Sequence, residues 1–564
     1  MDKINFSLRF VAKKKLALLI ILICIAVLLE VASLASILPV FTVLINKDID
    51  ESSYYFKYFE NLFDLEIFNF TPNLLFLVLF LYIFKTVYVY FIVYFQSKIS
   101  LEIQLKFADR LLKLYQEQGY LSFLKSKSSE LFRNVYSEVP LLVKFLILPV
   151  VIIITEIIIV ITLLLFISFV NLNFLLTVFA ILIFSSTSYF FYFSKRIKNW
   201  GEKRLQSDKF RVEFLQYNFD GFKEIKLTNK QKNFRDEYNN YNLISGTNNL
   251  FSSVLSQLPR YFLEILILSI VFAFIIINLF NENDLTDLIP VLAVFFGAFY
   301  RILPSINRIY QSVQSIKFGL PVFEKIYGEF KKIESRKKNN LEFNFKDMIE
   351  FKDIFFSYPD KKILLNNINF KIKKGECIGI VGESGSGKST LINILIGLLS
   401  PTSGEIKVDH IKRDLNSDNW FKLISHIPQE IFLLNDSIKK NIAFGIKDEL
   451  INDDRIKNII NEVKLNKLLE NLPKGINTEV GDKGSNISGG EKQRIAIARA
   501  LYKNTEIFVF DEATNSLDKE NENSILKLIK SLKGTKTIIM ISHNDSILDF
   551  TDKVLRIENN QIKD

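Results

Sequence analysis

The sequence predicts a membrane-spanning, all-α domain of six helices followed by an α/β domain that carries a P-loop. Of the 564 residues 49% are hydrophobic, including 53 Phe, which is more than an ordinary soluble protein contains. Apolar stretches of roughly 20 residues, the length that crosses a bilayer, recur up to residue 310. Beyond residue 348 short β-type runs alternate with helices. We therefore expect a membrane domain at 1–330, a polar linker at 331–347 and an α/β domain at 348–564.

The six predicted spans lie at 16–44, 73–97, 140–169, 172–194, 251–280 and 286–312. Long segments separate the second span from the third and the fourth from the fifth. In both segments apolar residues recur at helical spacing among charged ones, as in helices that leave the membrane and continue in water. The first domain is therefore expected to have long cytoplasmic helical extensions.

The charges of the loops predict the orientation of the spans in the membrane. The segment 47–66 is mainly acidic and is expected outside the cell, whereas the lysines at 13–15 and the basic cluster at 195–198 mark the cytoplasmic side. Six crossings then leave the α/β domain in the cytoplasm. The net charge of +10 is read as loop charge of a multi-pass membrane protein, so no nucleic-acid partner is expected. Two cysteines provide neither a disulfide framework nor a metal cage.

A P-loop follows the predicted strand "ECIGIV". The segment "GESGSGKST" precedes an apolar helix, which is the strand–loop–helix context that the motif requires. Backbone N–H groups and the helix N-terminus bind phosphates, Lys388 reaches the β and γ phosphates, and Ser389 ligates Mg²⁺. ATP and Mg²⁺ are the expected cofactors. The predicted phosphate-binding set is Gly382, Ser384, Gly385, Ser386, Gly387, Lys388, Ser389 and Thr390.

A second motif, which is acidic, supplies the other residues expected for ATP hydrolysis. In "EIFVFDEATNSLD" an apolar strand ends at Asp511 and Glu512. Asp511 is expected to hold Mg²⁺ through water, and Glu512 to polarise the water that attacks the γ-phosphate. These two residues would make the domain an ATPase.

The run "NISGGEKQRIAIARAL" resembles the ABC signature, and 348–564 resembles an ABC nucleotide-binding domain. The resemblance implies adenine stacking by Tyr358, Mg²⁺ and membrane-domain contacts by Gln429, and γ-phosphate contact by His543. It also implies that the signature binds the nucleotide held by the opposite subunit and that Asp518 lies on a loop crossing the dimer interface. The implied signature contacts are Ser488, Gly489 and Gly490.

The sequence departs from the family pattern at two places. It has ISGGE where LSGGQ is usual and NSLD where SALD is usual. Glu491 adds a negative charge near the triphosphate, which is expected to slow turnover, whereas the intact Glu512 predicts hydrolysis.

One P-loop and one signature per chain imply two chains, and we expect a homodimer. Spans fused ahead of the nucleotide domain resemble a six-helix ABC exporter half. Two segments, 116–124 and 217–225, are candidates for the loops that contact the nucleotide domain in that family. An ordinary helix hairpin remains the alternative for each.

Basic residues lie in or near the predicted spans, where an exposed guanidinium costs about 3 kcal/mol on insertion scales. We therefore expect them to line a polar interior. Arg260 and Glu264 can instead pair along one helix, and Arg308 can reach the membrane surface. The basic residues are Lys85, Arg260, Arg301 and Arg308, against the acids Glu30, Glu156 and Glu264.

The segments "AFYRILPSINRIY", "LPRYFLE" and "NDSIKKNIAFG" resemble the bacterial flippases for lipid-linked oligosaccharides. That resemblance implies an ATP-hydrolysing flippase of a polyprenyl-pyrophosphate-linked oligosaccharide in the bacterial inner membrane, active in glycosylation. Its expected partners are an anionic lipid-linked substrate, membrane lipids and a second copy of the chain. The alternatives are an exporter of another amphiphile (lipid, drug or peptide) and an ATP-gated channel or regulatory subunit without turnover. Glu512 and His543 argue against the last of these.

Overall fold

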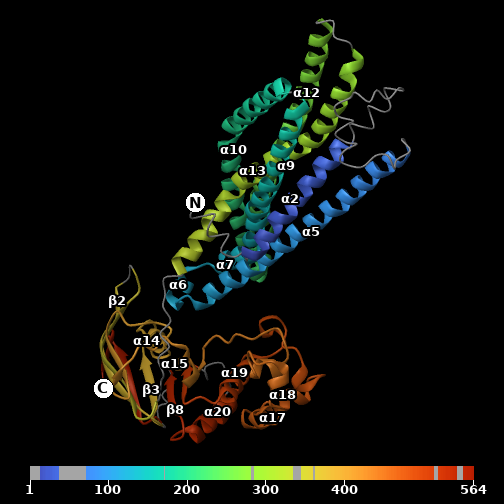
Figure 1. The fold of residues 1–564 in the computed structure, drawn as a ribbon. Coiled ribbons are helices and arrows are strands. Elements are labelled where there is room, and N and C mark those ends of the chain that lie inside the picture. The colour runs from blue at the N-terminus through green and yellow to red at the C-terminus, as the bar shows by residue number, and fades with distance from the viewer. Residues whose placement is uncertain are drawn as a thin grey trace. The chain divides into compact units, whose positions relative to one another are not determined.

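The structure is a computed structural model of the chain, and its contacts divide the chain into two compact units (Figure 1). One unit contains 1–118 and 126–335, and the other contains 119–125 and 336–564. The short segment 119–125 therefore belongs to the second unit although it interrupts the first in sequence. The described residues are 13–36, 72–170, 172–280, 285–333, 345–359, 362–512, 519–542 and 551–563.

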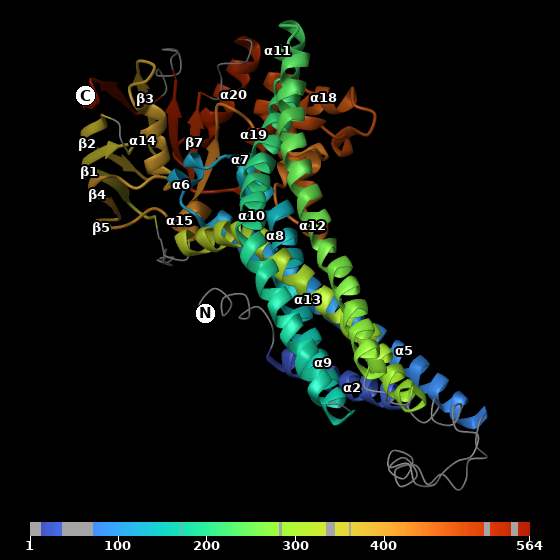
Figure 2. The same ribbon diagram turned by 90° about the horizontal axis from the view of Figure 1, so that it is seen from above.

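The described part of the first unit is helical. Helices α10 and α12 run side by side, and α13 packs along both α9 and α10 (Figures 1 and 2). The predicted extensions are present, because α5 and α10 continue without interruption from their apolar halves into charged sequence. The long helices are α2 (Lys13–Ala35), α5 (Pro72–Glu117), α9 (Leu148–Val170), α10 (Leu172–Asp220), α12 (Gln231–Phe280) and α13 (Leu285–Ile333).

Among the described residues, two helical segments are long and apolar enough to cross a membrane by length and composition. They are Leu75–Glu117 and Ser128–Leu165, and Ala17–Ser33 is a shorter apolar helix. The second of them begins well before the predicted span at 140–169. The reason is that the helix already begins in the charged sequence before the apolar run.

That helical segment contains two π-helical turns. It runs through α7 (Ser128–Arg133), η2 (Asn134–Glu138), α8 (Val139–Leu142) and η3 (Val143–Ile147) into α9. Single π turns inside α-helices frequently mark functional positions. Here the first of them places Glu138 at the centre of a buried ionic cluster.

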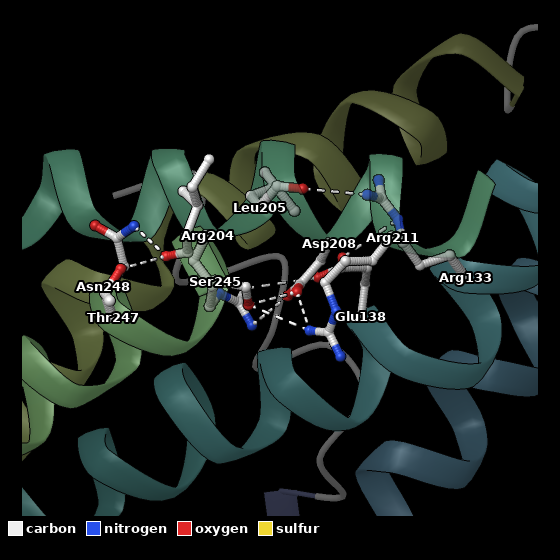
Figure 3. Close-up of polar contacts among 10 residues, drawn as sticks. Arg133, Glu138, Arg204, Leu205, Asp208, Arg211, Ser245, Thr247 and Asn248 are labelled. Atoms are coloured by element: carbon white, nitrogen blue, oxygen red, sulfur yellow. Dashed lines mark hydrogen bonds and ion pairs between the residues drawn. The ribbon is translucent and has the colours of Figure 1, made fainter. Parts of the chain in front are cut away.

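In the buried ionic cluster the Glu138 carboxylate lies between two guanidinium groups (Figure 3). Its oxygens are 3.4 Å from Arg133 Nε and 3.8 Å from Arg204 Nη2, and all three side chains are at most 3% exposed. These distances exceed those of good charge-assisted hydrogen bonds, and neither Glu138 oxygen has a hydrogen-bond partner among the described residues. The cluster is therefore an electrostatic contact, between α7, η2 and α10.

The cluster continues to α12 through Asp208. One Asp208 oxygen accepts hydrogen bonds from Arg211 Nη1 and from Ser245 Oγ, both at 2.7 Å, and Arg204 Nη1 lies 3.5 Å from the other oxygen. Ser245, on α12, is 1% exposed. The network thus joins three helical segments that lie far apart in sequence (Figure 3).

The helices near this cluster approach closely because glycine allows it. A Cβ added to Gly201 would lie 2.2 Å from the Phe318 carbonyl oxygen, and one added to Gly319 would lie 2.5 Å from Phe145 Cβ. No side chain fits at such distances. Glycine therefore sets the spacing of α10, η3 and α13.

The second unit contains two sheets. The smaller has the antiparallel order β2-β1-β4-β5, and the larger has the order β10-β9-β3-β8-β7-β6 with parallel pairing from β9 to β6. The strands are β1 (Met348–Ser357), β2 (Ile363–Lys373), β3 (Cys377–Gly382), β4 (Ser403–Val408), β5 (Ile411–Lys412), β6 (Ile424–Ile427), β7 (Ile507–Asp511), β8 (Thr537–Ile541), β9 (Lys553–Glu558) and β10 (Gln561–Lys563).

The larger sheet is covered on both faces, which explains why its strands are continuous apolar runs. In β7 the residues alternate between two cores: Ile507 and Val509 belong to one, and Phe508 and Phe510 to the other. The first core also takes residues from the smaller sheet and from α14 (Lys388–Leu395). The second core takes residues from α16 (Ile438–Ile442), α17 (Asp453–Glu462), α19 (Gly489–Lys503) and α20 (Lys519–Leu532).

Candidate nucleotide site

The predicted phosphate-binding and acidic residues gather at one edge of the larger sheet. Strands β3, β8, β7 and β6 are parallel neighbours, so their carboxyl ends meet at this edge. The P-loop follows β3, Glu512 follows β7 and Gln429 follows β6. In open α/β sheets ligands bind outside the carboxyl ends of the strands.

The P-loop backbone is shaped by glycines. Gly385 and Gly387 have φ of +82° and +102°, and a Cβ on Gly387 would lie 2.9 Å from Leu365. Lys388 opens α14, and its Nζ donates to the carbonyl oxygens of Gly382 at 2.8 Å and Glu383 at 2.9 Å. The ammonium group is therefore held inside the loop.

The serines and threonine of the P-loop differ in exposure. Ser384 and Ser389 are exposed, whereas the buried Ser386 Oγ has no hydrogen-bond partner among the described residues. Thr390 Oγ1 lies 3.3 Å from the hydroxyl of Tyr358, which brings the predicted adenine-stacking residue to the P-loop helix. An unpartnered hydroxyl in this loop fits a phosphate oxygen, because buried polar groups are normally hydrogen-bonded.

Two ionisable groups at this edge are unfavourably placed without a ligand. Burial lowers the pKa of Lys388, and burial together with the neighbouring Glu512 raises the pKa of Asp511. An anionic phosphate would stabilise the charged lysine, and a divalent cation would stabilise the charged aspartate. The residues present thus fit ATP and Mg²⁺. Ser389, Gln429 and Asp511 are the residues that would hold the metal.

Glu512 and Gln429 are in direct contact. Gln429 Nε2 donates to a Glu512 carboxylate oxygen at 2.7 Å. Glu512 has φ of +50°, a left-handed conformation that is uncommon for such a residue and is enriched at active sites. The strained backbone and the amide contact together fix the direction of this carboxylate.

The signature lies at the start of α19, where Ser488 and Gly489 are exposed. Ser488 caps the N-terminus of α19: its hydroxyl accepts from the Glu491 N–H at 3.4 Å, and the Glu491 carboxylate accepts from the Ser488 N–H at 2.7 Å. This is a capping box, for which Glu and Gln are both suitable. The departure at Glu491 therefore has a local structural role, and Gly489 and Gly490 begin the helix as predicted for an anion site.

Asp518 and His543 lie outside the described residues. The described chain stops at Glu512 before the first and at Ser542 before the second. Ser542 follows β8, between the P-loop strand β3 and the acidic strand β7.

Three of the four basic residues of the predicted spans are paired with acids among the described residues, and for Arg260 the partner is the acid one turn away that the sequence offered as the alternative. Lys85 Nζ lies 3.5 Å from Glu30, Arg260 Nε lies 2.8 Å from Glu264, and Arg308 Nε lies 3.1 Å from Glu156. The three acids seen in the sequence are thus the three partners. The side chain of Arg301 lies outside the described residues.

The paired cations differ in exposure. The Lys85 side chain is 13% exposed and also donates to Ser33 Oγ at 3.3 Å, which gives it an interhelical role between α2 and α5. The side chains of Arg260 and Arg308 are 60% and 45% exposed. Each contacts its acid through Nε.

Sequence analysis missed two residues of the second unit. Asn441 is fully buried, and Arg499 contacts it from α19. An asparagine in a short helix and an arginine in a charged helix give no signal at the level of sequence. Their contacts are visible only in the folded chain.

Residues 119–124 of the first candidate coupling segment, 116–124, belong to the second unit. Helix α6 (Tyr120–Lys125) follows Gly119, and its Tyr120 and Leu121 pack against the core that contains the P-loop helix. The second candidate lies at the turn between α10 and α11 (Phe222–Leu227). Of its large apolar side chains, Tyr217, Phe219 and Phe222 are 46%, 74% and 66% exposed, whereas Ile225 is buried.

Comparison with known proteins identifies relatives of this arrangement. The family model for the ABC transporter matches residues 365–515. The ATP-dependent lipid A-core flippase of Saccharophagus degradans is 32% identical over 64% of this chain and 61% of its own length. A putative export ATP-binding/permease protein of Rickettsia typhi is 31% identical over 66% of this chain and 65% of its own length.

A solved structure shares the fold. The structure of a bacterial Atm1-family ABC exporter with ATP bound superposes with a TM-score of 0.79 at 19% identity, over 98% of this chain and 95% of that one. The predicted fold class is thereby confirmed. By sequence, the chain spans 37% of the length of one curated relative, the lipid A-core flippase of Ralstonia nicotianae, and less than two thirds of the two relatives above.

Proposed function

We propose that the protein is an ATP-hydrolysing transporter of an amphiphile, because residues 365–515 match the family model for the ABC transporter and the chain has the fold of an ABC exporter. The observation that carries the proposal is the contact of Glu512 with Gln429 at the sheet edge that also holds the P-loop. In that position Glu512 would orient the water that attacks the γ-phosphate, while Lys388 would neutralise charge on the phosphates. The loop charges support a cytoplasmic α/β unit, and the resemblance to bacterial flippases supports a location in the bacterial inner membrane.

The working assembly that we propose is a homodimer. Phe219 and Phe222, which we call the exposed aromatic tip, are 74% and 66% exposed. The second unit has an exposed aromatic patch, defined as Phe432 (65% exposed) and Phe444 (46% exposed). A second copy of the chain would bury both by packing its tip on this patch, because contiguous exposed aromatic groups mark interaction sites.

Cysteine cross-linking tests this assembly. In a chain with Cys24 and Cys377 replaced by Ala, we expect Phe222→Cys together with Phe432→Cys to form a disulfide that doubles the mass on a non-reducing gel. The matched control is Phe222→Cys with Ile363→Cys, because Ile363 is equally exposed on β2 (54%) but lies outside the patch. A disulfide within one chain, or equal cross-linking by the control, would rule out the proposed packing.

For the cargo we propose an anionic lipid, with a polyprenyl-pyrophosphate-linked oligosaccharide as the specific candidate. The exposed side chains of Arg260 and Arg308 support it, since Arg binds phosphate through a planar fork. The acids that pair with them hold each guanidinium in place but also reduce its net charge. That pairing favours a second candidate, an exporter whose amphiphilic cargo carries no phosphate.

A flipping assay separates the two candidates. We expect the double variant Arg301→Ala, Arg308→Ala to flip a fluorescent polyprenyl-pyrophosphate sugar in proteoliposomes at least tenfold more slowly than the parent, because losing one charge-assisted contact of roughly 1.5–3 kcal/mol already has that effect. ATP binding should be unchanged. The control is Lys198→Ala, which removes an exposed basic residue of the pair Lys198–Glu202. Equal flipping by the parent and the double variant would remove the anionic-lipid proposal and leave the broader one.

A further inference from the structure

The exposed aromatic patch is fastened to the signature helix by one arginine. Arg499, on α19, donates from Nη1 to the Phe432 carbonyl oxygen at 3.0 Å and from Nε to the Asn441 carbonyl oxygen at 2.9 Å. Its guanidinium also lies 4.5 Å from the centre of the Phe444 ring. A single planar group thus contacts both aromatic residues of the patch, one through its backbone and the other through its ring.

Asn441 completes this connection from the interior. It is fully buried, and its Oδ1 accepts from Arg499 Nη2 at 3.2 Å and from the Leu434 N–H at 2.9 Å. Its Nδ2 donates to the carbonyl oxygens of Leu434 at 3.0 Å and Ser437 at 3.1 Å. Both ends of the amide are therefore used to hold the segment 432–437 in one conformation, and that segment follows Gln429 by three residues.

The helix that carries Arg499 is a rigid element with the signature at its start. Its residues Gln493–Ala498 are buried, and Ser488 caps it. Arg499 and Gly489 are ten positions apart, which is about 15 Å along an α-helix. A displacement of the patch can therefore reach the signature through a single helix, without a flexible loop in between.

We propose that Arg499 and Asn441 form a positioning unit that couples the exposed aromatic patch to the signature helix. Nucleotide bound at Ser488–Gly490 then changes the conformation of the patch, and a second copy packed on the patch changes the conformation of the signature. The inference rests on the proposed ATP-dependent function. It goes beyond that function by naming the side chains that transmit the change between the docking surface and the ATP-binding motif. Coupling of this kind is reciprocal, so it can be measured from the nucleotide side with no knowledge of the cargo.

Hydrogen–deuterium exchange of the full chain in lipid nanodiscs, with and without AMP-PNP and Mg²⁺, tests the unit. In the parent we expect AMP-PNP to slow exchange of the amides at 432–444. In Arg499→Lys we expect that response to fall by roughly fivefold or more, the lower end of usual coupling, because an ammonium group cannot satisfy three acceptors in one plane. AMP-PNP affinity, measured on the same samples, should stay within about threefold, since Arg499 lies outside the P-loop.

A matched control separates coupling from loss of packing. Arg455 also stacks on an aromatic ring, that of Tyr502 at 5.1 Å, and donates to the Leu501 carbonyl oxygen on the same helix α19, but it lies away from the patch. Arg455→Lys should therefore keep the response of the parent at 432–444. Should Arg499→Lys fail to fold, Asn441→Asp retains the acceptor for Arg499 but loses the Nδ2 hydrogen bonds to the carbonyl oxygens of Leu434, Asp436 and Ser437, and it should show the same loss.

The outcomes are distinct. A full response in Arg499→Lys or in Asn441→Asp would overturn the positioning unit, as would an equal loss in Arg455→Lys. A parent that binds AMP-PNP without any change at 432–444 would also overturn it. A parent that does not bind AMP-PNP at all would instead contradict the proposed function, and the binding isotherm reports that separately.

Discussion

Replacing Glu512 with Gln should lower steady-state ATP hydrolysis by roughly 10²–10⁴-fold, the usual contribution of a general base. The substitution keeps the size of the side chain and leaves an oxygen that can still accept the hydrogen bond from Gln429, so the local geometry should persist. The P-loop contacts of Lys388 are untouched. ATP binding, measured by equilibrium titration, should therefore remain close to that of the parent.

Glu491→Gln is the matched control, because it removes a carboxylate of the same size from the same nucleotide-binding unit. Gln is suitable for the capping box that Glu491 forms with Ser488, so α19 should be unchanged. We expect this variant to hydrolyse ATP at least as fast as the parent, since a negative charge near the signature is removed. Unaltered turnover in Glu512→Gln would reassign the catalytic carboxylate to another residue.

Replacing Glu138 with Ala should destabilise the helical unit by about 3–5 kcal/mol, the cost of removing one partner from a buried ion pair. Arg133 and Arg204 would then face each other's charge in a buried site without the carboxylate between them. Thermal unfolding in nanodiscs, followed by circular dichroism, should show a lower midpoint.

Two further variants show whether the loss of stability in Glu138→Ala comes from the buried charges. Lys198→Ala breaks an exposed pair on the same helix α10 and should cost less than about 1 kcal/mol. The triple variant Arg133→Met, Glu138→Leu, Arg204→Met replaces the charges by apolar groups of similar size, and it should recover most of the stability, as buried ion pairs elsewhere do. If Glu138→Ala melted at the temperature of the parent, the buried ionic cluster would not be a stabilising contact of these helices.

The sequence alone was sufficient where a short motif fixes both local structure and chemistry. The P-loop glycines, the acidic pair after an apolar strand and the signature ahead of a helix could each be read in place, because each depends on residues adjacent in the chain. Apolar stretches long enough to cross a bilayer could also be listed from the sequence, and among the described residues two helical segments, Leu75–Glu117 and Ser128–Leu165, meet that length and composition. The second begins well before the apolar run at 140–169, because the helix starts in charged sequence.

Pairing between distant side chains was decided by the tertiary structure. The sequence identifies four basic and three acidic residues in the predicted spans but not which of them are in contact. The pairs Lys85–Glu30 and Arg308–Glu156 join separate helices, so no local sequence pattern encodes them. The same holds for Glu138 between two arginines and for Arg499 beneath the aromatic patch. A motif is a property of neighbours along the chain, whereas the neutralisation of a charge depends on which helix packs beside it, and only folding determines that.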